Sequence, residues 1–243
     1  MKRYVSAPVT GLQRLTSRVF LLRVRWDGPP DANPGQFYML GAEGKTLPRP
    51  ISLCDTEGDE LVFCIDEVGE GTRQFGALRP GDCLPVTGPL GNGFDMEALW
   101  HCKRVALVSG GVGIAPFALL GRCLREAGVS VESFCGFADE PYLTERLPNP
   151  QIATESGRVG TKGYPTALLD AGAFDAVCAC GPEPLLRAAG RLCRDTGTAC
   201  QLSYDARMAC GVGACLVCTC ETVHGFRRCC ADGPVFKGEE MKL

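Results

Sequence analysis

The sequence predicts a β barrel followed by a parallel α/β domain and a small cysteine-rich module at the C-terminus. Short apolar segments separated by Gly, Pro and Asp turns occupy the first 99 residues. From residue 100 onward, apolar strands alternate with amphipathic helical patterns, as in α/β domains. Cysteines then crowd the last segment of the chain. We therefore expect domains at residues 1–99, 100–203 and 204–243.

The expected barrel strands are short and bounded by turn residues. Clusters such as Arg79-Pro80-Gly81-Asp82 interrupt the apolar segments. Short strands at this spacing are typical of a small barrel. The predicted strands are Ser17–Trp26, Gln36–Leu40, Ile51–Cys54, Leu61–Asp66 and Leu84–Thr87.

The pattern changes after residue 102. The continuous apolar run Val105–Val108 predicts a parallel strand that is buried on both faces. Residues 116–128 begin with Pro, end with Gly and have apolar residues at helical spacing, which predicts a helix. Further strands are expected at Val131–Phe137 and Ala176–Ala179, and a second helix between Pro182 and Gly197.

Composition argues against several kinds of partner and compartment. The 243 residues carry a net charge of −3, so no basic surface indicates nucleic acid. No apolar run reaches the roughly 18 residues of a membrane span, and no secretory signal is recognisable. Cysteines outside the tail have no framework spacing, and several lie in apolar runs such as Leu61–Ile65. We expect buried, reduced thiols and a cytoplasmic protein.

The strongest functional signal is the cysteine spacing near the C-terminus. Cys210, Cys215 and Cys218 have the C-x4-C-x2-C spacing of plant-type [2Fe–2S] ligands, with glycines between the thiols. A tight glycine loop directs backbone N–H groups at the sulfurs. Spacing alone leaves the fourth ligand open between Cys229 and Cys230. Zinc is the alternative metal, but the second C-x2–4-C hairpin of a typical zinc site is missing.

Two glycine turns of the α/β domain are candidate nucleotide contacts. The segment between the first strand and its helix contains Gly110, Gly111 and Gly113, which would let a pyrophosphate approach the helix N-terminus. Cys180-Gly181-Pro182 follows a later strand, at the edge where ligands bind in open α/β sheets. Either turn alone is also compatible with an ordinary tight connection.

Two barrel segments are candidate cofactor contacts. In Arg49-Pro50-Ile51-Ser52, the guanidinium can pair with a phosphate and the hydroxyl can bond a ring nitrogen. The segment with Gly71 and Thr72 would open a short helix onto a pyrophosphate. Alone, each segment is more often a turn than a site. Their order ahead of a nucleotide-type domain makes them informative.

Together these motifs resemble the ferredoxin-reductase superfamily, in which a flavin-binding barrel precedes a nicotinamide-binding domain. The tail from Arg207 to Phe236, with Asp232-Gly233-Pro234-Val235-Phe236 after the cysteines, is similar to the electron-transfer subunits of NAD-dependent dihydroorotate dehydrogenases. Segments 88–94, 110–116 and 153–163 also match, so the resemblance covers essentially the whole chain. It implies a ferredoxin-reductase-like flavin-binding barrel, a parallel-sheet nucleotide-binding domain and a small [2Fe–2S] module.

The resemblance implies three redox groups: FAD, a [2Fe–2S] cluster and NAD. The residues that would line the isoalloxazine and phosphates of FAD are Arg49, Pro50, Ile51 and Ser52, with Gly71 and Thr72 at the pyrophosphate. The residues that would face NAD are Gly110, Gly111 and Gly113 at its phosphates, and Cys180, Gly181 and Pro182 at the nicotinamide. The family pattern selects Cys230 over Cys229 as the fourth metal ligand, beside Cys210, Cys215 and Cys218.

The resemblance also implies a partner and a reaction. An FMN-containing catalytic subunit would oxidise dihydroorotate to orotate in pyrimidine biosynthesis, in a heterotetramer with two copies of each chain. Electrons would pass singly through the cluster to FAD, which gives a hydride to NAD⁺. The cofactors carry this chemistry, so no catalytic side chain is expected. The tail should face the catalytic subunit.

Two details concern specificity and departures from the family. Asp139 and Glu140 follow the expected strand that ends at Phe137. An acidic residue there accepts from ribose hydroxyls and repels a 2′-phosphate, which favours NAD over NADP; a solvated turn is the alternative. Asp66-Glu67 stands where relatives often carry a basic residue, which bears on flavin contacts from that strand.

Two other functions fit parts of the pattern. One is an NADH-dependent flavin and iron–sulfur reductase for another acceptor protein, which the segment Asp232–Phe236 disfavours. The other is a zinc-stabilised binding module with an empty nucleotide fold. A visible flavin and iron–sulfur spectrum distinguishes the last from both reductases.

Overall fold

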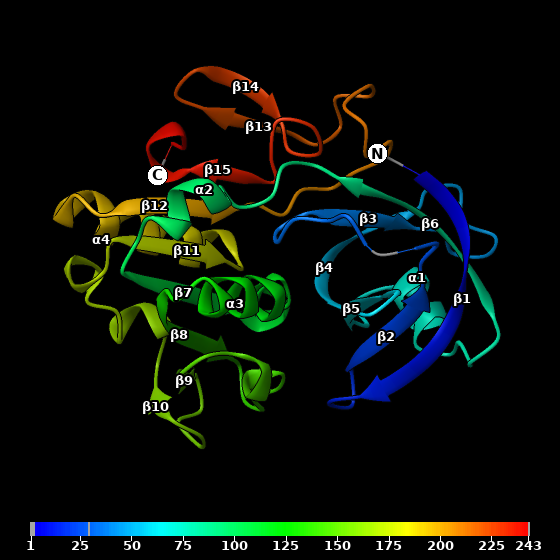
Figure 1. The fold of residues 1–243 in the computed structure, drawn as a ribbon, viewed down its shortest axis with the longest axis horizontal. Helices are drawn as coiled ribbons and strands as arrows, with labels where there is room; N and C mark the ends of the chain where they lie inside the picture. The colour runs from blue at the N-terminus through cyan, green and yellow to red at the C-terminus, as the bar shows by residue number, and fades with distance from the viewer. Residues whose placement is uncertain (1–2, 29, 243) are drawn as a thin grey trace.

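The computed structural model describes residues 3–28 and 30–242, and shows two halves side by side with the C-terminal tail lying across their junction (Figure 1). The first half is a closed antiparallel barrel with strand order β1-β2-β5-β4-β3-β6. Its strands are β1 (Arg3–Arg14), β2 (Val19–Arg25), β3 (Phe37–Leu40), β4 (Arg49–Glu57), β5 (Glu60–Asp66) and β6 (Cys83–Leu90).

All five predicted barrel strands are present, and β1 is an additional strand that the sequence pattern did not reveal. The reason is its weak apolar alternation, since only Ala7 and Val9 are buried along it and Tyr4 is exposed. Its pairing with β2 and β6 closes the barrel. Backbone hydrogen bonds to two neighbours therefore hold a strand that buries little of its own surface.

Large aromatic side chains fill the barrel. Trp26 and Tyr38 meet edge to face with ring centroids 5.4 Å apart, and Tyr38 and Phe63 do so at 5.6 Å. All three are buried. Such a packed interior leaves no channel, so a ligand of this barrel must bind on its outside or rim.

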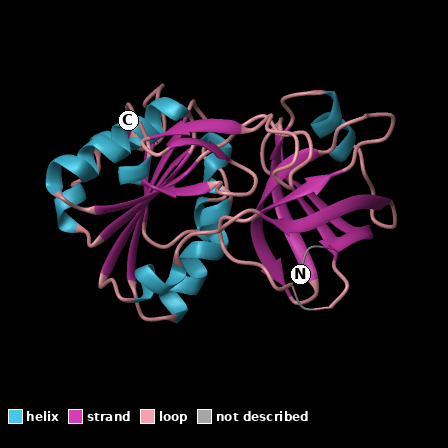
Figure 2. Ribbon diagram, turned by 90° about the horizontal axis from the view of Figure 1, so that it is seen from above, coloured by secondary structure: helices cyan, strands magenta, loops and turns pink. Residues whose placement is uncertain are grey.

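The second half is a seven-stranded sheet of order β10-β9-β8-β7-β11-β12-β15. The first six strands of that order run parallel, and β15 joins antiparallel at the edge. Helices cover both faces of the sheet (Figure 2). The strands are β7 (Arg104–Gly110), β8 (Ser130–Phe137), β9 (Pro150–Thr154), β10 (Thr161–Lys162), β11 (Ala176–Cys180), β12 (Ala199–Ser203) and β15 (Val235–Lys237).

The buried strand β7 shows why the sequence pattern predicted this sheet. Val105 and Leu107 pack in the core with the helix α3 (Pro116–Glu126), while Ala106 and Val108 pack on the opposite face with α4 (Glu183–Thr196). Both predicted helices are confirmed. As predicted, α4 ends at Gly197, which adopts φ of 72° as a left-handed C-cap.

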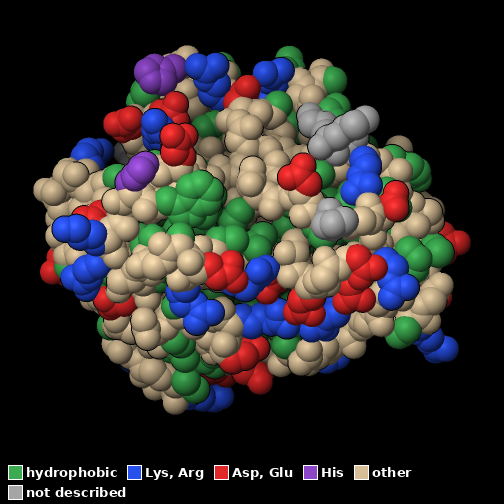
Figure 3. Space-filling view, viewed as in Figure 1, with side chains coloured by type: hydrophobic (Ala, Val, Ile, Leu, Met, Phe, Trp, Pro, Cys, Tyr) green, Lys and Arg blue, Asp and Glu red, His purple; other side chains and the backbone are tan. Residues whose placement is uncertain are grey.

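The remaining elements are short. They are α1 (Glu70–Phe75), α2 (Met96–Trp100) and the 3₁₀ turns η1 (Gly111–Ile114), η2 (Thr144–Arg146), η3 (Pro165–Ala167), η4 (Ala171–Ala173) and η5 (Gly238–Glu240). In the described ranges, every helix is too short or too polar to cross a bilayer. Charged side chains cover much of the surface, and a group of them lies over the junction of the two halves (Figure 3).

The cysteines outside the tail show the expected burial at some positions and not at others. All sixteen cysteines lie within the described residues and are free. Those buried outside the tail are Cys54, Cys64, Cys135, Cys178, Cys180 and Cys193. Burial was not general, however, because Cys83 is exposed on the barrel.

The C-terminal tail is tied into both halves. A small hairpin is formed by β13 (Thr219–Thr222) and β14 (Gly225–Arg228). The chain then returns as β15, whose Val235 lies opposite Ser203 of β12. Of the tail strands, β15 therefore extends the sheet of the α/β half, while β13 and β14 form a separate two-stranded sheet.

Candidate cofactor sites

The two predicted glycine turns of the α/β half are in direct contact. β7 and β11 are parallel neighbours, with Ser109 opposite Cys180. A Cβ atom on Gly113 would lie 2.4 Å from the Cys180 carbonyl oxygen, and one on Gly181 would lie 2.9 Å from the Gly110 nitrogen. Only glycine permits this approach of one turn to the other. The structure thus brings Gly110, Gly113 and the Cys180-Gly181-Pro182 segment together at one edge of the sheet.

The remaining glycine of the first turn faces open space. Gly111 has φ of 55°, and an added Cβ would meet nothing nearer than the Tyr142 hydroxyl at 4.0 Å. The turn then winds into η1, and η1 contacts β5 of the barrel. These turns therefore combine accessible backbone with a helix start, the arrangement that binds pyrophosphates.

The predicted barrel segments also meet. A Cβ on Gly71 would lie 2.6 Å from Arg49 Nε, so the guanidinium packs against the first turn of α1. The Thr72 hydroxyl donates to the Gly69 carbonyl oxygen and accepts from the Gly69 N–H, at 3.1 Å each. A first helical turn leaves backbone N–H groups without helical partners. Positive charge and free donors here suit a phosphate.

Pro50, Ile51 and Ser52 continue from Arg49 along β4 and are all partly buried. Ser52 lies opposite Phe37 in the β3–β4 ladder, and Pro50 lies opposite Met39. This ladder contacts the C-terminal tail, because Phe37 and Met39 of β3 share a buried cluster with tail cysteines.

The cysteine loop packs on that ladder. A Cβ on Gly211, which has φ of 68°, would lie 2.8 Å from Met39 Cγ and 3.2 Å from Leu90 Cδ1. Met39, Leu90 and three tail cysteines form one buried cluster, whose cysteines are Cys218, Cys229 and Cys230. Nothing in the local sequence of β3 indicated that Met39 would contact the C-terminal tail.

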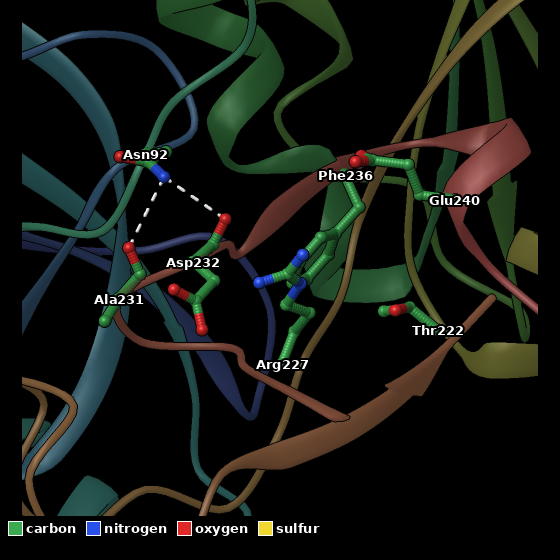
Figure 4. A pocket seen from close by; sticks show the side chains of 7 residues that line it. All are labelled: Asn92, Thr222, Arg227, Ala231, Asp232, Phe236 and Glu240. Carbon is green, nitrogen blue, oxygen red and sulfur yellow. Dashed lines mark hydrogen bonds between the residues drawn. The ribbon is translucent and has the colours of Figure 1, made fainter. Parts of the chain in front are cut away.

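The segment after the cysteines anchors the tail to the start of the linker between the halves. The Asn92 N–H donates to the Gly233 carbonyl at 2.6 Å, and its side-chain amide donates to the carbonyls of Ala231 and Asp232 (Figure 4). These groups border a pocket of about 270 Å³ beside Arg227 and Phe236. The segment from Gly88 to Phe94, which matched the family pattern in the sequence, thus has a structural role, because its Asn92 binds the C-terminal tail.

The structure places backbone donors at two of the four predicted metal ligands. The Val212 N–H donates to Cys210 Sγ at 3.4 Å, and the Cys230 N–H donates to Cys218 Sγ at 3.4 Å. Across the described chain, no three Cys, His, Asp or Glu side chains converge on a single point. A [2Fe–2S] cluster takes two thiolates at each iron beside its bridging sulfides, so four cysteines are the number that it needs.

Backbone hydrogen bonds and burial shift the pKa values of these thiols in opposite directions. Hydrogen bonding from the Val212 N–H, helped by neighbouring donors, lowers the pKa of Cys210 to about 6. Burial, together with the adjacent Cys218 thiol, raises the pKa of Cys230 to about 12. Two anionic sulfurs cannot share a buried site without a cation between them, which is the condition that a metal cluster relieves.

Cys229 and Cys230 point to different partners. The Gly213 N–H donates to Cys230 Sγ at 3.1 Å, so that sulfur lies within the cysteine loop. The Cys229 thiol instead donates to the Tyr204 carbonyl at 3.3 Å, and burial raises its pKa strongly. Cys220 lies on β13 with its thiol 3.5 Å from the Arg227 carbonyl oxygen.

The rim of the cysteine loop is apolar and exposed. Leu216 is 63% exposed, and Val212 and Val217 are about half exposed. On the neighbouring hairpin, Phe226 is 75% exposed. A separate cleft of about 800 Å³ lies on the barrel, where Met39, Lys45 and Gln74 are among the residues that line it. Exposed apolar groups in such proximity are typical of a protein interface.

Asp139 is not free to meet a ribose in this structure. Its carboxylate accepts from Ser156 Oγ at 2.6 Å and pairs with Arg158 Nη1 at 3.0 Å. The prediction of NAD binding rested on the acidic residue alone. The sequence did not reveal that Arg158, from a later loop, pairs with this acid. The predicted ribose contact of Asp139 thus lies within an ion pair with Arg158.

A barrel with a phosphate-compatible rim, a nucleotide-type sheet and a four-thiol loop between them define a ferredoxin-reductase-like protein with an iron–sulfur tail. A solved NADH-dependent reduced ferredoxin-NADP oxidoreductase, described for flavin-based electron bifurcation, superposes with a TM-score of 0.86 and 26% identity, covering 97% of this chain and 89% of that chain. A ferredoxin NADP⁺ reductase from Neisseria gonorrhoeae shares the fold at a TM-score of 0.66 and 16% identity, over 80% and 92% of the two chains.

Comparison of sequences is more specific. Residues 205–242 match the family model of the iron–sulfur cluster binding domain of dihydroorotate dehydrogenase B. The electron transfer subunit of dihydroorotate dehydrogenase B (NAD(+)) from Clostridium perfringens is 40% identical, over 87% of each chain. Its counterpart from Caldanaerobacter subterraneus is 37% identical over 99% of each chain. The chain belongs to this family of electron transfer subunits.

Proposed function

We propose that this chain carries electrons between the FMN-containing catalytic subunit of a dihydroorotate dehydrogenase and NAD, in pyrimidine biosynthesis. The observation that carries the proposal is the position of the cysteine loop. Gly211 packs on Met39, and Met39 pairs with Pro50 of the strand expected to face the flavin. A single β ladder thus lies between the two expected redox sites. Such proximity suits electron transfer between them.

The cofactors are FAD and a [2Fe–2S] cluster, with NAD as the exchangeable electron carrier. When bound, FAD exchanges one or two electrons, the cluster exchanges one, and NAD takes a hydride. The residues of the chain bind and orient these groups, and none acts as an acid or base. Arg49, with the backbone of Gly71 and Thr72, holds the FAD phosphates, and Pro50, Ile51 and Ser52 line the isoalloxazine.

The glycine turns bind the dinucleotide. Gly110, Gly111 and Gly113 present backbone to the NAD phosphates, and Cys180-Gly181-Pro182 flanks the nicotinamide. Because the two turns already touch, binding requires little rearrangement of either. The metal ligands are Cys210, Cys215, Cys218 and Cys230, with the N–H groups of Val212 and Gly213 directed at their sulfurs.

The exposed rim of the cysteine loop is the surface for the catalytic subunit. Its apolar residues would be buried in a heterotetramer of two copies of each chain, and no nucleic acid or membrane takes part. We place this complex in the cytoplasm. Within the chain, residues 1–99 bind FAD, residues 100–203 bind NAD and residues 204–243 bind the cluster.

A variant of Cys215 tests the proposal. Cys215→Ala removes one ligand while leaving the barrel and the glycine turns intact. With the catalytic subunit present, dihydroorotate-dependent NADH formation should be lost, while reduction of FAD by NADH survives. Retention of both activities would show that electrons do not pass through the cysteine loop.

A further inference from the structure

A cluster of charged side chains lies where β4 meets α3 and η2, apart from every cofactor contact described above. The Asp55 carboxylate, on β4, is only 8% exposed. Arg122 of α3 lies 2.6 Å from one of its oxygens and also donates to the Thr56 carbonyl at 3.1 Å. Arg146 of η2 lies 3.3 Å from the other oxygen and 2.8 Å from Glu57.

The acids come from the barrel and these two arginines from the α/β half. We call Asp55, Glu57, Arg122 and Arg146 the junction cluster. Glu57 is also paired within the barrel, to Arg23 at 3.1 Å. Asp55 has no such support, because its remaining bond comes from the neighbouring Thr56 N–H. A buried carboxylate needs its charge compensated, and the other half supplies that compensation.

The junction cluster joins the two elements that carry the expected flavin and nicotinamide sites. β4 begins with the Arg49–Ser52 segment and reaches Asp55 a few residues later. α3 begins directly after the glycine turn and carries Arg122 in its second turn. Strand and helix are stiff at this length, so pairing Asp55 with Arg122 fixes the distance between the two sites.

We propose that Asp55, Arg122 and Arg146 are positioning residues for hydride transfer, holding the nicotinamide turns against the flavin strand. This inference rests on the proposed function, because it takes FAD to bind on β4 and NAD at the glycine turns. None of the three is among the residues assigned to a cofactor, so each acts through the placement of the two halves. Misplacement of reacting atoms by about 1 Å is enough to cost about 10²-fold in rate.

Asp55→Asn tests this directly, in the full chain with its cofactors loaded. The amide keeps the shape of the side chain but removes the charge that draws in both arginines. The limiting rate of FAD reduction by NADH should fall about 10- to 100-fold, while the NADH concentration at half-maximal rate changes less than about 3-fold. Flavin and iron–sulfur absorption should keep their wild-type intensity.

Two further variants keep the test decisive. Arg122→Lys preserves the charge but loses the planar fork, so it should fold and show a smaller loss in limiting rate. Asp59→Asn is the matched control, because the Arg25–Asp59 pair is 3.4 Å long, exposed and confined to the barrel. It should behave as wild type.

The outcomes separate this inference from the proposed function. If the wild-type protein holds FAD but NADH fails to reduce it, the proposed function itself is wrong. If wild type is active and both Asp55→Asn and Arg122→Lys keep the wild-type limiting rate, the positioning role is overturned. A loss confined to NADH affinity, with the limiting rate unchanged, also contradicts it.

Discussion

The glycine turns at the sheet edge and the cysteine loop of the tail are built in opposite ways. At the sheet edge, backbone packs on backbone, and Gly113 approaches the Cys180 carbonyl with no room for a side chain. The cysteine loop instead rests on Met39 with one face and exposes Leu216 on the other. The difference follows the chemistry proposed for each. Hydride transfer needs contact and a fixed geometry, whereas an electron relay needs a buried side toward the flavin and an open side toward a partner.

The largest expected effect tests the inner side of the cysteine loop. Cys230→Ser should abolish iron–sulfur absorption, because Cys230 alone of the adjacent pair has its sulfur inside the loop. Cys229→Ser is the matched control and should retain the cluster, since its thiol bonds the Tyr204 carbonyl. Iron content and visible absorption measure both. The reverse pattern would assign the fourth ligand to Cys229.

A second change tests the rigidity of the sheet edge. Gly113→Ala would bring a methyl group into the Cys180 carbonyl, so the two turns must separate. Reduction of FAD by NADH should slow by about 10²-fold while FAD stays bound. Gly172→Ala is the control, because its added methyl meets nothing nearer than 3.5 Å. A Gly113→Ala protein with wild-type reduction rates would contradict the assignment of the dinucleotide to these turns.

A third change tests the outer side of the cysteine loop. Leu216→Asp adds charge to the exposed rim and should weaken binding of the catalytic subunit by about 1–3 kcal/mol, as loss of an apolar interface contact does. Reduction of FAD by NADH should be unchanged, because the glycine turns are untouched. Titration of the variant with the catalytic subunit measures the loss. Unchanged affinity would place the partner elsewhere.

The smallest expected effect concerns the choice of dinucleotide. Arg158→Ala removes the charged partner of Asp139 and leaves its carboxylate bonded only by the Ser156 hydroxyl. The ratio of kcat/KM for NADH over NADPH should rise about 3- to 10-fold, since an unpaired acid repels a 2′-phosphate. Steady-state kinetics with both dinucleotides measure it. An unchanged or falling ratio would show that Asp139 does not repel a 2′-phosphate.

Local patterns predicted much of this molecule. The run Val105–Val108 identified a strand buried on both faces, and Gly197 marked the end of α4. The cysteine loop and the glycine turns were also recognisable from short segments of sequence. The backbone geometry that they require depends on few neighbouring residues. Features of that kind can be recognised without knowing the fold.

What the sequence did not reveal depends on contacts between distant residues. Met39 is an ordinary apolar strand residue until the tail packs on it, and β15 joins β12 only once the tail has folded back. The partners of Asp55 lie 67 and 91 residues away. The local sequence around a strand carboxylate does not predict which distant arginines will neutralise its charge. These contacts form only when segments that are distant in the sequence come together in the folded chain.

The central claim is that NADH, FAD and the cluster form one electron path through this chain. The visible spectrum of the anaerobically purified protein, before and after addition of NADH, tests it most directly. The account predicts flavin bands on a broad iron–sulfur absorption, both bleaching with NADH. A colourless protein that ignores NADH and cannot be reconstituted with FAD, iron and sulfide would contradict it.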